Sequence, residues 1–197
     1  MPYLWDPLTF DNLMAGTVLQ FERQEQKPLH GLSGVEGSGV YALYYKGKMA
    51  EYKPIAGTCR PIYVGKAVPP GARKGSAKPN LDYPALQTRL NEHIRSIEHA
   101  KNLSVEHFSC RVLPVVLNFI VFSEQALIQQ YKPVWNSCLD GFGKHPPGKK
   151  RKTGSRSWWD TLHPGRPWAE KETEDKTPQE ASQKVKSFLR GNEKTSN

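Results

Sequence analysis

The chain has 197 residues, with 28 Lys and Arg against 19 Asp and Glu, and carries a formal net charge of +9 at pH 7. This length suffices for a core without disulfide or metal support, and the composition excludes collagen-like, disulfide-rich and wholly disordered chains. The apolar stretch 112–122 is too short to cross a membrane, and the N-terminus does not resemble a signal peptide. Three widely spaced cysteines indicate free thiols in a reducing compartment. We therefore expect a cytoplasmic protein whose positive charge favours nucleic acid as partner.

The first half of the chain predicts two strands and then a helix. Residues 1–36 show only a weak helical pattern and are expected to form an N-terminal extension. The β-branched and aromatic residues of 40–45 and 61–65 predict strands. A proline opens a predicted helix over 84–100. Its apolar residues recur at helical spacing: Leu86, Leu90, Ile94 and Ile97.

The next elements complete a small domain. Alternating apolar residues predict a third strand over 108–112, and an apolar pattern predicts a second helix over 116–131. The order β-β-α-β-α predicts an α+β domain in which a three-stranded sheet is flanked by helices.

Two segments carry the whole excess of positive charge. Residues 60–83 hold five basic residues against one acidic residue, and residues 144–166 hold seven against one. Both are rich in Gly and Pro, so we expect a basic loop insertion at 66–83 and an extended DNA-wrapping arm over 139–170. The last residues, 171–197, are expected to be a flexible tail, although 181–189 could form a short helix.

Polar residues at the ends of these predicted elements have the side chains that hydrolysis of a phosphodiester needs. A carboxylate can hold a divalent cation, a guanidinium can stabilise the charge that builds on phosphorus, and a further group must activate water. The candidates are Tyr41, Tyr63, Arg89, His93, Glu124 and Asn136.

The order of these residues resembles the GIY-YIG nuclease superfamily. Gly39-Val40-Tyr41 and Tyr63-Val64-Gly65 resemble its paired motif, with Val in place of Ile in each half. The Arg, Glu and Asn candidates follow in the family's order, and the resemblance covers about residues 37–138. Long spacings and the basic, Trp-rich C-terminal part are similar to type II restriction endonucleases that cut CCGCGG. The resemblance implies a mainly antiparallel sheet.

The resemblance also implies roles. Glu124 would hold Mg²⁺, which Mn²⁺ can replace, Arg89 would bind the scissile phosphate, and Tyr41 would activate water with His93 as proton acceptor. Tyr63 and Asn136 would orient neighbouring groups. Double-stranded DNA is the implied substrate, and a palindromic site implies a homodimer. A cognate DNA methyltransferase is expected in the same bacterial cell, without a stable complex. Expected DNA contacts are Lys66, Arg73, Lys74, Lys78, Lys144, Lys149, Lys150, Arg151, Lys152 and Arg156.

Several alternatives stay open from the residues alone. The module could belong to a repair or mobile-element nuclease, or to a basic DNA-binding protein without catalysis. Tyr41 could be a core aromatic residue, and Arg89 could form a helix-surface ion pair with Glu92. The spacing of Cys138, His145 and His163 matches no closed zinc site.

Overall fold

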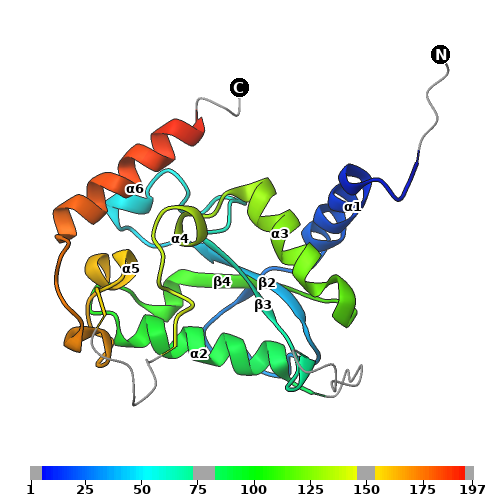
Figure 1. The fold of residues 1–197 in the computed structure, drawn as a ribbon, viewed down its shortest axis with the longest axis horizontal. Helices are drawn as coiled ribbons and strands as arrows, with labels where there is room; N and C mark the ends of the chain where they lie inside the picture. The colour runs from blue at the N-terminus through cyan, green and yellow to red at the C-terminus, as the bar shows by residue number, and fades with distance from the viewer. Residues whose placement is uncertain (1–5, 73–82, 146–153, 194–197) are drawn as a thin grey trace.

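A computed structural model describes residues 6–72, 83–145 and 154–193 of the chain. Its centre is one antiparallel sheet of four strands in the order β1-β4-β2-β3 (Figure 1). The strands are β1 (Lys27–Pro28), β2 (Gly39–Tyr45), β3 (Tyr63–Ala67) and β4 (Phe108–Pro114). The expected α+β class and antiparallel pairing are confirmed, but the sheet has four strands and not three. The fourth is β1, whose two residues pair with Ser109 and Cys110.

Helices flank this sheet (Figure 1). The longer ones are α1 (Phe10–Glu22), α2 (Ala85–His99), α3 (Ile120–Tyr131) and α6 (Pro178–Glu193). Two shorter ones are α4 (Val134–Ser137) and α5 (Trp158–Leu162). Among the described residues, no helix is long and apolar enough to cross a membrane.

Strand β2 is buried on both faces, which explains why its sequence is apolar without interruption. Tyr41 and Leu43 belong to the larger hydrophobic core, which also contains residues of α2, α4, α5 and α6. Val40, Ala42 and Tyr44 point the other way, into a smaller core with residues of α1 and α3. The alternation of side chains along one central strand thus assigns each helix to a face of the sheet.

Described residues after α4, within 139–145 and 154–193, are part of the main core, which corrects the expectation of an arm and a flexible tail. Phe142 and Trp159 are at most 1 % exposed and pack against Trp135 of α4. Two of the aromatic residues among the cations, Phe142 and Trp159, are therefore part of the core. Helix α6 buries its own apolar residues in the same cluster, namely Ala181, Val185 and Leu189. Residues 73–82 of the basic insertion and 146–153 of the expected arm lie outside the described part of the chain.

Candidate active site

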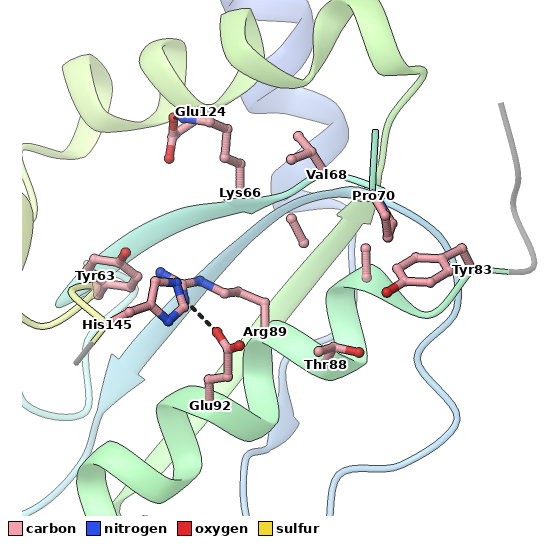
Figure 2. A pocket seen from close by; sticks show the side chains of 12 residues that line it. Tyr63, Lys66, Val68, Pro70, Tyr83, Thr88, Arg89, Glu92, Glu124 and His145 are labelled. Carbon is pink, nitrogen blue, oxygen red and sulfur yellow. Dashed lines mark hydrogen bonds and ion pairs between the residues drawn. The ribbon is translucent and has the colours of Figure 1, made fainter. Parts of the chain in front are cut away.

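The six candidate residues come from five elements, and most of them lie around β3, an edge strand of the sheet. Tyr41 lies on β2, Tyr63 on β3, Arg89 and His93 on α2, and Glu124 on α3. A pocket of about 430 Å³ lies between β3, α2 and α3 and is lined by Tyr63, Arg89 and Glu124 (Figure 2). The remaining candidate, Asn136 on α4, is not among its lining residues.

The glycines of the two motifs make room for this arrangement. A Cβ atom on Gly65 would overlap the hydroxyl of Tyr41. A Cβ atom on Gly39 would overlap the carbonyl oxygen of Leu113 on the neighbouring strand β4. Glycine is thus required in each motif for close packing, in one case directly against a candidate catalytic group.

Tyr41 and His93 form a buried pair behind the pocket. The Tyr41 hydroxyl lies 2.6 Å from Nε2 of His93, and the two side chains are 0 % and 1 % exposed. Burial, reinforced by the neighbouring Tyr63, raises the pKa of Tyr41 well above its usual value, against the opposing influence of Arg89. Burial, together with the charge of Arg89, holds the pKa of His93 well below its usual value. Both groups are therefore neutral near pH 7, and one short hydrogen bond joins the Tyr41 hydroxyl to the imidazole.

Arg89 is bonded to three neighbours that surround its guanidinium. Its Nη1 lies 2.5 Å from Oε2 of Glu92 and 2.9 Å from Nε2 of His145, and its Nη2 donates to the carbonyl oxygen of Gly143 at 2.8 Å. Figure 2 shows Arg89 reaching across the pocket floor between Tyr63, His145 and Glu92. The ion pair with Glu92, one of the alternatives for this arginine, is present, and Arg89 nevertheless lines the pocket.

Glu124 lies on the opposite wall and pairs with Lys66 of β3 (Figure 2). The Glu124 side chain keeps 16 % of its surface exposed, so solvent reaches it from the pocket. Across the described ranges, no group of three or more His, Cys, Asp or Glu side chains could together hold a metal ion. A single carboxylate still suits Mg²⁺, which keeps several waters and takes further ligands from substrate phosphates.

Asn136 is bound to the sheet and lies apart from the pocket. Its Oδ1 accepts from the amide of Val64 at 2.8 Å, and its Nδ2 donates to the Val64 carbonyl at 2.8 Å. The side chain therefore holds β3 next to Tyr63, which lines the pocket. Tyr63, 9 % exposed, packs its ring 6.3 Å from that of Tyr41.

The expected DNA contacts fall into two groups. Lys66 lines the pocket, Lys144 pairs with Asp140 at the surface, and Arg156 pairs with Glu174 while donating from Nε to the Ala169 carbonyl at 3.1 Å. The others lie outside the described residues: Arg73, Lys74, Lys78, Lys149, Lys150, Arg151 and Lys152. Their contacts with DNA stay predictions.

Three pocket groups differ from what the sequence predicts. Lys66 pairs with the candidate metal ligand, a contact that the sequence does not predict, while its expected contact with phosphate stays a prediction. Gly143 and His145, which bond Arg89, come from the segment after α4, more than 50 residues away in sequence. A hydrogen bond from an arginine to the backbone carbonyl of a loop leaves no signature in the sequence. For His145, the spacing from Cys138 and His163 suggests at most a zinc ligand.

The comparison with protein families gives a match that covers the site. The family model described as the Eco29kI GIY-YIG domain matches residues 33–189, which is most of the chain and includes every candidate residue. A comparison with curated proteins found no match. The matched range extends to α6, in agreement with a core that the C-terminal helices complete.

Proposed function

Because the chain belongs to the Eco29kI GIY-YIG family, a family of restriction endonucleases, we propose that it is a type II restriction enzyme that cuts both strands of a specific DNA palindrome. The observation that carries this proposal is the pocket in which Arg89 and Glu124 face each other, with the Tyr41–His93 pair directly behind. An arginine, a metal-binding carboxylate and a proton acceptor are the groups that hydrolysis of a phosphodiester requires.

In the proposed mechanism, the guanidinium of Arg89 binds the scissile phosphate and stabilises the charge that develops on it. Its present acceptors, Glu92 and the Gly143 carbonyl, hold it in the pocket before DNA arrives. Water attacks phosphorus, the phosphorus–oxygen bond to one sugar breaks, and the leaving sugar oxygen takes a proton from solvent.

Proton transfer in this mechanism runs through the buried pair. Tyr41 takes a proton from the attacking water as its own proton passes to Nε2 of His93. The low pKa of His93 keeps this nitrogen free to accept at neutral pH. The Tyr41 side chain is fully buried, so DNA binding must shift the side chains that cover its hydroxyl before water reaches it.

Glu124 would hold the Mg²⁺ or Mn²⁺ ion of this reaction. When bound, the ion supplies neutralisation of the phosphate charge and acidifies a bound water. The Lys66 ammonium forms an ion pair with the Glu124 carboxylate. This ion pair would have to open for Glu124 to bind a metal ion. Lys66 is then free to contact a DNA phosphate, as the sequence predicts.

The recognition sequence, the oligomeric state and the host are proposals that go beyond the general activity of the family. We propose CCGCGG as the site, a homodimer in which each chain cuts one strand, and a host bacterium that protects its own DNA with a methyltransferase. Base contacts by Arg to guanine in the major groove would give the sequence choice.

Digestion of a fully sequenced DNA tests this proposal. The purified protein is incubated with unmethylated plasmid in Mg²⁺ and in EDTA, and the fragment ends are mapped by sequencing. Discrete, metal-dependent ends within CCGCGG are expected. Metal-dependent smearing would instead indicate a repair or mobile-element nuclease, and intact DNA that still shifts on a gel would indicate a binding protein.

A further inference from the structure

Residues 141–145, which we call the backing segment, lie against several of the proposed catalytic side chains. The ring of Phe142 stacks on the imidazole of His93, with centroids 4.5 Å apart and planes inclined by 15°. The same ring meets Tyr63 edge-on at 4.9 Å. The position of the imidazole that accepts the Tyr41 proton therefore depends on where Phe142 lies.

The backing segment also holds Arg89. The Gly143 carbonyl accepts from Nη2 of Arg89 at 2.8 Å, and Nε2 of His145 lies 2.9 Å from Nη1. A Cβ atom on Gly143 would come within 2.7 Å of the Tyr63 hydroxyl, so this backbone lies directly against the pocket. A small shift of the backing segment would move the phosphate-binding group.

The backing segment belongs to no strand or helix, and Arg166 bonds its first part. Nη1 of Arg166 donates to the Phe142 carbonyl at 3.1 Å, and Nη2 donates to the Gly141 carbonyl at 2.9 Å. The arginine is 2 % exposed and lies between two indole rings, 4.5 Å from the centre of Trp159 and 4.6 Å from that of Trp168. It is therefore held firmly enough to fix the carbonyls that it binds.

Asp160 of α5 orients this arginine. Nε and Nη2 of Arg166 each donate to a different oxygen of Asp160 at 2.6 Å. The carboxylate also accepts from the Ser157 hydroxyl at 2.6 Å, and Ser157 caps α5. The planar fork of arginine makes these bonds and the two carbonyl bonds at once, which a lysine ammonium cannot do.

Stability alone is a weak reason for such a pair. Burying two charges costs solvation that their attraction often fails to recover, so an apolar pair of similar volume would serve the core as well. An apolar pair would not bind the carbonyls of the backing segment. We propose that Arg166, oriented by Asp160, is a positioning residue of the nuclease site, which holds the backing segment and thereby Arg89 and His93. This inference rests on the proposed function, because it assigns no separate reaction.

The test compares Arg166→Ala and Arg166→Lys with Tyr52→Phe. Tyr52 belongs to another buried polar network, in which its hydroxyl accepts from Trp135 Nε1 at 2.8 Å and lies 2.6 Å from Nε2 of His163. These two partners lie outside the backing segment. Removal of the Tyr52 hydroxyl therefore controls for a general loss of stability in the same part of the fold.

Cleavage is measured in single turnover with saturating protein and Mg²⁺, and DNA binding is measured in EDTA. We expect Arg166→Ala to slow cleavage on the order of 10²-fold, as displacement of positioned groups does, while binding changes less than about threefold. Arg166→Lys should also cut more slowly than wild type. Tyr52→Phe should cut within about twofold of wild type, although it too loses buried hydrogen bonds.

Chemical rescue separates positioning from folding. Arg166 lines a second pocket of about 290 Å³ beside the first, so its removal opens a cavity that a small guanidinium can enter. Methylguanidinium should restore cleavage by Arg166→Ala, whereas methylammonium, which has the charge without the fork, should not. Neither should affect Tyr52→Phe.

Histidine-ring NMR reads out the same effect without cleavage. The ring signals of His93 should shift in Arg166→Ala and return with methylguanidinium, and they should stay unchanged in Tyr52→Phe. Unchanged His93 signals, or cleavage by a folded Arg166 variant at the rate of Tyr52→Phe, would overturn the inference. If Arg166→Ala does not fold, Arg166→Lys decides by the same two measurements. Absence of cleavage by the wild-type protein would instead refute the proposed function and leave the NMR result to judge the positioning.

Discussion

The Tyr41 hydroxyl lies 2.6 Å from Nε2 of His93, and the pair sits behind the pocket wall with almost no exposed surface. The two side chains are both neutral and are joined by one short hydrogen bond. A proton can pass between them although neither a tyrosinate nor an imidazolium is present at the start. This relationship makes the pair directly testable.

Replacing Tyr41 by Phe should slow cleavage by about 10²-fold or more, because the proposed general base is lost. The ring and its packing remain, so the melting temperature should change little. Tyr44→Phe is the matched control, since Tyr44 lies on the same strand but faces the opposite core. Equal cleavage by Tyr41→Phe and Tyr44→Phe would exclude Tyr41 as the base.

Glu124→Gln should lose cleavage by about 10³-fold or more, because the proposed metal site loses its carboxylate. DNA binding in EDTA should persist and become slightly tighter, since a negative charge leaves the DNA-facing pocket. Gel shift and single-turnover cleavage measure the two effects. Glu98→Gln, at an exposed position of α2, is the control, and a parallel loss of binding would argue against a purely metal-binding role.

Arg89→Lys keeps the charge but loses the fork that now bonds Gly143 and Glu92. We expect the rate of the chemical step to fall about 10²–10³-fold, the scale of removing a donor that stabilises transition-state charge. Arg95→Lys, at an exposed position of the same helix, should leave the rate unchanged. A wild-type rate for Arg89→Lys would mean that charge alone suffices at this position.

Acidification should destabilise the protein through its buried histidines. Burial, together with the charge of Arg166, lowers the pKa of His163 to about 3 from the usual 6.5, and the pKa of His93 is also lowered. Below about pH 6.5 the unfolded chain therefore binds more protons than the folded one. The free energy of unfolding decreases as the pH is lowered through this range. Each histidine can contribute up to about 1.4 kcal/mol per pH unit.

Urea unfolding of the wild type and of His163→Gln at pH 7, 6 and 5 measures this contribution. The variant is less stable throughout, because Tyr52 and Asn102 lose their partner. Its stability should nevertheless fall less steeply with acidification than that of the wild type. Parallel slopes would show that His163 does not take up the proton on unfolding.

The basic run at 149–152 should contribute to DNA affinity by binding phosphates. When its four residues are changed to Gln, the slope of log K against log salt should fall by about 0.9 for every phosphate that the run neutralises in the wild type. Fluorescence anisotropy across a salt series measures that slope. The double change of Lys53 and Lys186 to Gln, both exposed on other elements, is the control, and an unchanged slope in the run variant would exclude phosphate binding by this run.

The sheet and its two main helices could be predicted because their patterns are local. Strand alternation indicates β4, and the stripe that includes Leu86 and Leu90 indicates the buried face of α2. The predicted helix over 116–131 begins instead with a short 3₁₀ turn, and α3 itself starts at Ile120. Strand β1 has two exposed residues, one of them proline, and so carries no pattern that could reveal it.

The packing of the C-terminal part could not be predicted for a different reason. Ala181, Val185 and Leu189 recur every fourth residue, but the polar residues between them are equally typical of a solvated helix. Only the tertiary fold shows that this stripe faces the core. The same limit applies to the site, where motif order identified Arg89 and Glu124 but loop packing supplied Gly143 and His145.

Asn136 has a consequence for solubility that its place in the motif does not suggest. Strand β3 is an edge of the sheet, and the side-chain amide of Asn136 satisfies both backbone groups of Val64 as a neighbouring strand would. The backbone amide of the preceding residue, Trp135, bonds the Ile62 carbonyl at 2.9 Å. An open edge can recruit strands of other molecules, and the Asn136 amide makes the backbone groups of Val64 unavailable for such pairing.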